Sequence, residues 1–381
     1  MHWLGQSSSN TGFHTLQLDI VGFLAILGEA SVKANAQVST LSLLSLLPRL
    51  LPAPQALIRT SRPEDLKADS GKVVGARSGG IRETVHHIAH LLHSSEPLKP
   101  YSVRCERITK PIPEATVSAR RFGPLAWLAL LGTGTSLALL VLSVTRRDGF
   151  ALLATVLLSL LSSLIGLGSR WSLKLGKRQQ SRHLPQDDIV IKYPKGAFLI
   201  VRCDENTARE LYWHPEECEY LVGNTTYRLV SLLGTITLMF GVICLGNSTL
   251  ELQIAFAAAY MILNAAYWAV AALPPQWHWD LSCYDVERRD YGKEDHATFT
   301  LALWKAIAIT QSVDWVKHGQ IAPVSNAWKS WIDKAGEVVM RQIEMDEAWG
   351  NTEGNRWKMP EWDADQALTD YLNLGAAGNH V

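Results

Sequence analysis

Four long apolar stretches dominate the pattern of hydrophobic and polar positions along the chain. None contains an acidic residue, a basic residue or a histidine, and they run over Phe122–Val144, Gly149–Gly168, Leu229–Gly246 and Leu252–Leu273. About 20 apolar residues are needed to cross the hydrocarbon core of a bilayer as a helix. The pattern therefore predicts a mainly α membrane protein with four transmembrane helices in two hairpins, at 122–168 and 229–273.

The region between the two hairpins, residues 169–228, has a different pattern. Two β-rich runs, Ile189–Tyr193 and Ala197–Val201, flank a short turn at 194–196 that contains proline and glycine. Such an arrangement is typical of a β-hairpin, and a short helix is expected over Asn206–Tyr212. We therefore expect a small cytoplasmic α+β insert here.

The C-terminal region, residues 274–381, is predicted to be helical and to end in an acidic tail. Its stretch Thr298–Val313 is apolar except for Lys305 and Gln311. Because a lysine at the middle of a membrane span is costly, a buried or interfacial helix is favoured over one that enters the bilayer. An amphipathic helix follows, and a short helix is expected from Pro360 to Leu372.

The N-terminal region, residues 1–58, contains two shorter apolar runs. Asp19 interrupts Leu16–Leu27, and three prolines and an arginine interrupt Leu41–Ile58. A proline inside a helix removes a hydrogen bond and clashes with the preceding turn. These features favour a pair of amphipathic helices, buried or lying on a membrane surface, with a fifth span as the alternative.

Residues 59–121 are polar and contain several glycines and prolines, which is a linker composition. We expect a partly disordered linker there, with one short helix at 81–93.

The positions of lysine and arginine predict an orientation. Ten basic residues flank the first hairpin, whereas its turn has only Arg146 and Arg147 and the second turn has none; the ten are Arg104, Arg107, Lys110, Arg120, Arg121, Arg170, Lys174, Lys177, Arg178 and Arg182. Basic residues accumulate on the cytoplasmic side of membrane proteins. Both termini and residues 169–228 are therefore expected in the cytoplasm, so the sequon at Asn224 should carry no glycan.

The amino-acid composition argues against some classes of binding partner. Lys+Arg and Asp+Glu both number 36, and basic residues form no stripe over a folded face, so nucleic acid is not expected to bind. The five cysteines are scattered without a C-x-x-C pair, which argues against a zinc ribbon. The expected partners are the lipid bilayer and a cytoplasmic protein, and no cofactor is expected.

The strongest hint of an enzyme is a histidine cluster. On a helix, His86, His90 and His93 share one face with Glu83, and imidazoles one turn apart can hold a metal ion. Membrane desaturases and hydroxylases need several such clusters, however, and position 87 is a histidine, so HExxH is absent. An ordinary amphipathic helix is favoured, and no catalytic, cofactor-binding or metal-binding residue is assigned.

Two pairs of adjacent carboxylates, Asp187-Asp188 and Glu216-Glu217, are interpreted as solvated surface, because neighbouring side chains in extended structure point apart.

Four segments of the sequence resemble those of known proteins. They are DDIVIKYPKGAF at 187–198, YMILNAAYW at 260–268, WDLSCY at 279–284 and LWKAIA at 303–308. Over roughly residues 120–345 the chain resembles a group of uncharacterised multi-pass membrane proteins of filamentous fungi. The resemblance implies a membrane protein and supplies no catalytic residues.

The leading hypothesis is a non-enzymatic membrane component, or scaffold, that presents cytoplasmic surfaces to partners. Trp349, Trp357 and Trp362 are candidate contacts, with aromatic packing inside the domain as the alternative. A small-solute or lipid transporter is a second hypothesis, weakened because the spans lack the ionisable residues that usually mark ion pathways. A metal-dependent membrane enzyme that uses the histidine cluster is the third.

Overall fold

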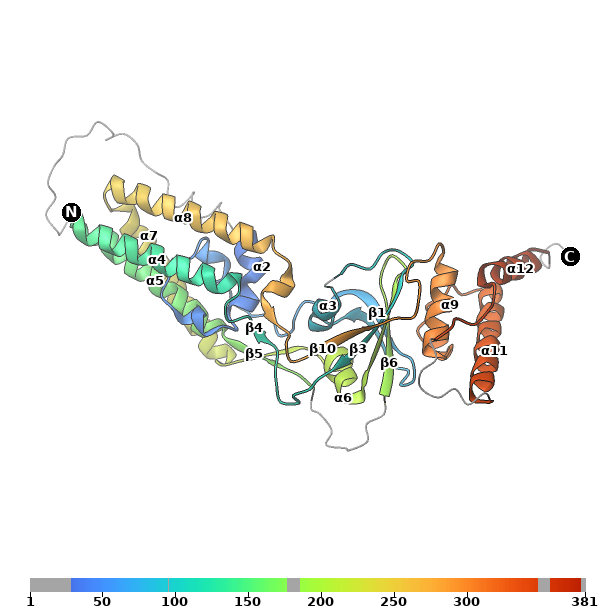
Figure 1. Cartoon of the computed structure of the whole chain (residues 1–381). Coiled ribbons are helices and arrows are strands. Elements are labelled where there is room, and N and C mark those ends of the chain that lie inside the picture. Colours follow the sequence, from blue (N-terminus) through green and yellow to red (C-terminus); the bar gives the residue numbers. More distant parts are fainter. Residues whose placement is uncertain (1–28, 95, 177–185, 349–356, 378–381) are drawn as a thin grey trace. The chain divides into compact units, whose positions relative to one another are not determined.

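The computed structural model describes residues 29–94, 96–176, 186–348 and 357–377, and it divides into two compact units. The helical unit comprises the chain up to Glu64 together with Thr116–Lys174 and Glu217–Leu281. The α/β unit comprises Asp65–Ala115, Leu175–Glu216 and the chain from Ser282 onward. Many elements of each unit are labelled in Figure 1.

The helical unit contains four helices long and apolar enough to cross a membrane. They are α4 (Pro124–Thr145), α5 (Gly149–Ser169), α7 (Asn224–Gly246) and α8 (Leu250–Ala271). Helix α4 contacts α5 and α8, and α5 contacts α7. The apolar stretches of the sequence located all four helices to within a few residues of their ends.

Short turns join α4 to α5 and α7 to α8, and side chains tie the two turns together. The Asp148 carboxylate caps α5 by accepting hydrogen bonds from the amides of Phe150 and Ala151. Its second oxygen accepts a 2.7 Å hydrogen bond from the amide of Thr249, just before α8. Asp148 therefore fixes the start of one helix beside the start of another.

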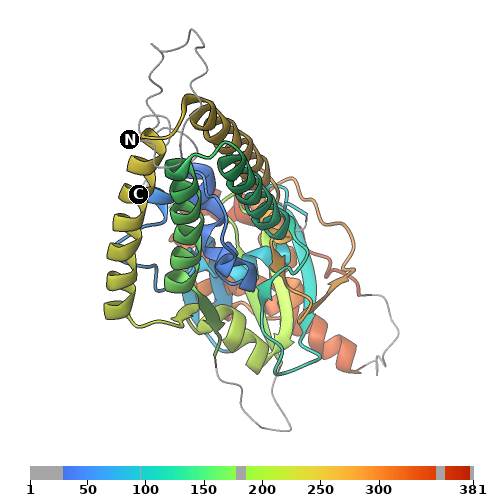
Figure 2. The same ribbon diagram turned by 90° about the vertical axis from the view of Figure 1, so that its left-hand side faces the viewer.

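The N-terminal segment packs among the long helices but differs from the predicted pair of amphipathic helices. Helix α2 (Glu29–Ser39) is followed by two short 3₁₀ turns, η1 (Leu43–Leu46) and η2 (Pro54–Ala56), with irregular backbone between them. Figure 2 shows this blue segment beside the green helices α4 and α5. The prolines of the segment prevent a continuous helix. The run Leu16–Leu27 lies outside the described residues.

Two small two-stranded sheets complete the helical unit. One pairs β5 (Trp171–Lys174) with β8 (Glu217–Tyr220), and the other pairs β4 (Ser118–Ala119) with β9 (Trp279–Asp280).

A six-stranded mixed sheet forms the centre of the α/β unit, in the order β10-β3-β7-β6-β1-β2. Its strands are β1 (Asp69–Gly75), β2 (Ile81–Val85), β3 (Val103–Thr109), β6 (Gln186–Lys192), β7 (Phe198–Asp204) and β10 (Asp285–Arg289). Strands β3 and β7 are parallel, and the other neighbours are antiparallel. The predicted hairpin is β6 and β7.

Both faces of this sheet are covered, which the continuous apolar runs of β6 and β7 explain. Runs such as Ile189–Ile191 have no alternating polar face, so both sides must be buried. One face packs against the C-terminal helices through Val190, Ile200 and neighbouring residues. On the other side lie α3 (His87–His93), α6 (Glu205–Ala208) and the π-helical turn η3 (Arg209–Trp213).

The polar region 59–121 was expected to be a linker, and the structure shows otherwise. It contains β1, β2, β3 and α3, so half the strands of the large sheet come from it. The predicted helix at 81–93 is in fact strand β2 followed by α3. Several charged residues of these short strands form ion pairs, such as Lys72 with Glu83 and Arg104 with Glu294, which a hydrophobic pattern does not reveal.

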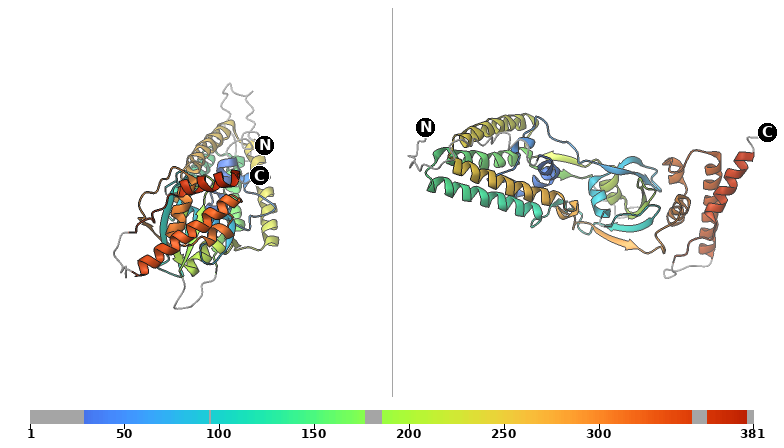
Figure 3. Two further views of the ribbon diagram at one scale, coloured as in Figure 1. Left: turned by 90° about the vertical axis from the view of Figure 1, so that its right-hand side faces the viewer. Right: turned by 90° about the horizontal axis from the view of Figure 1, so that it is seen from above.

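The C-terminal region forms α9 (Phe299–Thr310), α10 (Asp314–His318), α11 (Asn326–Ala348) and α12 (Ala364–Ala377). Figure 3 shows α9, α11 and α12 side by side, in orange to red. Helix α9 lies in the core of the α/β unit, and buried Lys305 is satisfied by donating a hydrogen bond to the carbonyl of Lys293.

Two of the tryptophans considered as partner contacts are partly buried and pack against other rings of the α/β unit. The Trp362 ring centroid lies 4.7 Å from that of Trp304 and 5.3 Å from that of Trp331. The Trp357 ring packs edge-on against Tyr291 at 5.2 Å. Trp349 lies outside the described residues.

Candidate functional site

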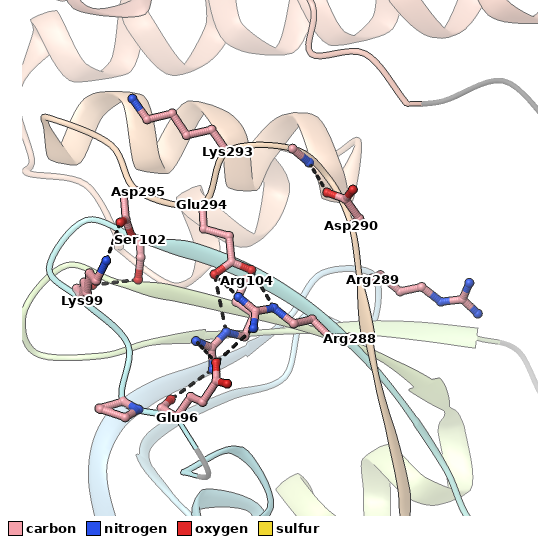
Figure 4. A pocket seen from close by; sticks show the side chains of 12 residues that line it. Glu96, Lys99, Ser102, Arg104, Arg288, Arg289, Asp290, Lys293, Glu294 and Asp295 are labelled. Carbon is pink, nitrogen blue, oxygen red and sulfur yellow. Dashed lines mark hydrogen bonds and ion pairs between the residues drawn. The ribbon is translucent and has the colours of Figure 1, made fainter.

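A charged pocket of about 670 Å³ is the candidate site of the α/β unit. It lies between strand β3, strand β10 and the segment that leads from β10 to α9. Figure 4 shows the lining residues, which are Glu96, Pro97, Lys99, Ser102, Arg104, Arg288, Arg289, Asp290, Gly292, Lys293, Glu294 and Asp295.

Most of the charges in this pocket are paired with one another. Glu294 accepts two hydrogen bonds from Arg288, at 2.9 and 2.6 Å, so the pair is bidentate. Arg288 also donates to a carboxylate oxygen of Glu96 at 3.0 Å. Bidentate pairs of this kind fix geometry as well as charge. The pairs therefore connect β10 to the segments on both sides of the pocket.

Arg104 forms the floor of the pocket and is buried. It donates a 3.0 Å hydrogen bond to the backbone carbonyl of Glu96, and its Nε lies 3.7 Å from the carboxylate of Glu294. Figure 4 shows Arg104, Arg288 and Glu294 converging, whereas Lys293 extends away from them. Lys293 is exposed, so its positive charge lies at the rim of the pocket.

Behind the pocket lies a buried chain of polar side chains. His93 Nδ1 lies 2.6 Å from the carboxylate of Glu106, and its Nε2 lies 2.7 Å from the hydroxyl of Tyr212. Burial raises the pKa of Tyr212 well above its ordinary value. Because all three side chains are enclosed, the arrangement holds α3 and η3 against β3 and does not present a nucleophile to a substrate.

The histidine cluster of the sequence does not converge in the structure. Glu83 lies on strand β2, and His86 precedes helix α3, where its Nδ1 lies 2.8 Å from the carbonyl of Leu211. His90 lies near the ring of Tyr193, at 6.1 Å between centroids. Within the described residues, no group of three metal-ligating side chains is positioned to hold a metal ion.

Glu216 was interpreted as solvated surface, and it is buried instead. Its two carboxylate oxygens accept hydrogen bonds of 2.8 and 2.9 Å from the amides of His87 and Ile88, at the start of α3. Burial raises the pKa of Glu216 to about 7, against the effect of these two bonds. Its neighbour Glu217 is exposed and pairs with Lys174 at 2.9 Å.

Asp188, from the other carboxylate pair, is also buried. Its carboxylate lies 3.6 Å from Arg202 on the neighbouring strand. Sequence spacing gave no sign of this partner, because the two residues meet only through the pairing of β6 with β7.

Comparison with protein-family models, with curated proteins and with solved structures finds no match for this chain.

Proposed function

We propose that this chain is an integral membrane protein whose α/β unit faces the cytoplasm and serves as a binding platform for a partner protein. In this account the four long helices cross the bilayer as two hairpins. The charged pocket on the α/β unit supplies the contact surface, and no catalysis is required of it.

The topology of the large sheet carries the proposal. Strand β3 precedes α4 and α5, strands β6 and β7 lie between the helix pairs, and β10 follows α8, yet all four belong to one sheet. A sheet can form only on one side of a membrane. Each intervening pair of helices must therefore return to the side from which it started, which two crossings achieve.

The basic residues support a cytoplasmic position for that side. Arg120 and Arg121 precede α4, Arg170 follows α5, and Arg228 is the fifth residue of α7. The turn after α4 has Arg146 and Arg147, and the turn after α7 has no basic residue. The excess of positive charge at the helix ends that lead along the chain to the strands of the sheet favours the cytoplasm for the α/β unit.

The roles of the polar side chains in the α/β unit favour binding over catalysis. The buried histidine and carboxylates of the α/β unit are engaged in holding its secondary structures together. The pocket rim, in contrast, exposes Lys293, and it also exposes Lys99 and Asp295, which are joined by a 2.8 Å hydrogen bond. Exposed charges at a rim guide a partner of complementary charge and set its association rate.

The test is the native mass of the full-length protein, extracted from its own membranes in a mild detergent. A stoichiometric protein partner is expected, and the paired substitutions Lys99→Glu and Lys293→Glu should reduce its recovery at least tenfold. Lys334→Glu reverses a charge on α11 at a side chain that is 42 % exposed, away from the pocket, and should leave recovery unchanged. A lone protein or a homo-oligomer would contradict the proposal.

A further inference from the structure

The helical unit contains a second polar site, which the sequence did not reveal. The segment between η1 and η2 inserts its backbone between α4 and α5. The amide of Arg49 donates to the Ser162 hydroxyl at 3.0 Å, and the amide of Leu50 lies 3.3 Å from the carbonyl of Gly132. These bonds satisfy N–H groups of a backbone segment that is not helical. Inside a bilayer, where water is absent, every backbone N–H and C=O group needs such a partner within the protein.

Glycines on the two helices make this insertion possible. A Cβ atom at Gly166 of α5 would lie 2.2 Å from the carbonyl oxygen of Ser45. A Cβ at Gly132 of α4 would lie 2.9 Å from the carbonyl oxygen of Leu50. Any larger residue at either position would displace the segment, so the inserted backbone requires glycine at both positions.

Arg49 is thereby placed deep in the helical unit. Gly132 is eight residues from the start of α4, which corresponds to about 12 Å along the helix. A bilayer core is about 30 Å thick, so Arg49 lies near mid-depth if the helices span the membrane as proposed. The depth of Arg49 in the bilayer rests on the proposed function, in which the helices span the membrane, whereas the contacts around Arg49 do not.

The charge of Arg49 is not balanced by a carboxylate among the described residues. Its guanidinium donates one hydrogen bond of 2.9 Å, to the backbone carbonyl of Leu44. The side chain is buried, and its Nε has no hydrogen-bond partner in the described part of the chain. A buried and unpaired charge is strongly destabilising, so a compensating group is expected.

Two further unpartnered polar atoms belong to residues of the same cavity. Ser45 is 1 % exposed and His278 is 4 % exposed, and their Oγ and Nδ1 atoms also lack hydrogen-bond partners within the described residues. Both residues line a cavity of about 20 Å³ together with Arg49, Arg120 and Tyr267. Three residues that line one small cavity thus each have a buried polar atom without a hydrogen-bond partner among the described residues.

We propose that this polar cavity binds a small inorganic monoanion of the chloride class. Guanidinium can only donate hydrogen bonds, and the Ser45 hydroxyl is free to donate a second. A water molecule would satisfy these donors but would leave the positive charge unbalanced. The cavity exceeds the roughly 10–15 Å³ that one water requires, and it is too small for phosphate or an organic anion.

The test compares thermal unfolding of the purified full-length protein in chloride and in gluconate at constant ionic strength. Chloride and bromide should raise the unfolding temperature in a saturable way, by roughly 3–5 °C at ten times the Kd. Arg49→Gln and Ser45→Ala should abolish or weaken this rise. Arg146→Gln, whose exposed side chain pairs with Glu251, should retain it.

Line broadening in the chloride NMR signal of the wild-type protein, reversed by bromide, gives a second measurement if the Arg49 variant does not fold. Equal unfolding temperatures in chloride and gluconate, together with no broadening, would overturn the proposal and assign the cavity to water. Because these readouts do not depend on topology, failure of the anion site leaves the proposed membrane arrangement standing.

Discussion

Replacing Trp331 with alanine tests the packing of the C-terminal helices most severely. Its side chain is fully buried, its ring centroid lies 5.4 Å from that of Trp328, and its Nε1 donates a 2.8 Å hydrogen bond to the carbonyl of Ala364. Trp331 therefore joins α11 to the start of α12.

The magnitude follows from these contacts. Truncating a buried tryptophan to alanine costs about 3–5 kcal/mol, and losing a hydrogen bond adds about 1 kcal/mol. A typical domain has only about 5–15 kcal/mol of stability, so Trp331→Ala should remove roughly a quarter or more of it. Leu374→Ala is the control, because that side chain is 68 % exposed and its loss should change stability by less than about 0.5 kcal/mol.

The assay is a urea titration of the full-length protein in detergent, with resistance to proteolysis of the α/β unit as the readout. That readout avoids the change in fluorescence caused by removing a tryptophan. A loss of less than about 1 kcal/mol for Trp331→Ala would refute the packing described for α11 and α12. It would also reopen the idea that the neighbouring Trp362 serves a partner.

Two further predictions concern one position in each unit. Gly166→Ala should destabilise the helical unit by about 1–3 kcal/mol through overpacking against Ser45, whereas Gly134→Ala, where a Cβ meets nothing within 4 Å, should not; equal thermal stability in detergent would contradict this. Burial raises the pKa of Glu216 from 4.5 to about 7, so the stability that its protonated form contributes is fully present below pH 4.5 and is lost as pH rises through 7. Urea titrations should show that the wild-type α/β unit loses on the order of 2–3 kcal/mol over that range relative to Glu216→Gln. Parallel stability profiles of the two proteins would exclude the effect.

Hydrophobic pattern located the elements that bury only apolar surface. The four long helices need nothing but length and apolar side chains, and β6 and β7 carry continuous apolar runs around a proline–glycine turn. Such elements can be recognised from local sequence, because their stabilisation does not depend on a distant partner.

Elements stabilised by polar partners escaped the same reasoning. Strand β3 carries Arg104 and Glu106, which are buried only because Glu96, Glu294 and His93 meet them from other segments. Region 59–121 therefore looked like a linker. Arg49 was missed for a related reason: a segment broken by prolines gives no helical pattern, and Gly132 and Gly166 give no sign of the backbone they accommodate.

The same limit applies to the candidate sites. Glu83 and the histidines at 86, 90 and 93 share a face only if the whole segment is one helix. Helix α3 begins at His87, so it contains His90 and His93 but neither Glu83 nor His86. The charged pocket joins residues about two hundred positions apart, such as Glu96 and Arg288. The order of strands in the sheet brings them together, and no local spacing specifies that order.

The central claim is that both helix pairs return to the side of the membrane on which the sheet forms. It is tested most directly by cysteine labelling in sealed membrane vesicles with the cytoplasmic face outward. Two exposed positions are compared, Asn247→Cys in the turn after α7 and Glu361→Cys before α12, against the background of the wild-type chain. A membrane-impermeant maleimide should label position 361 at once and position 247 only after the vesicles are permeabilised. Labelling of position 247 in sealed vesicles would contradict the account.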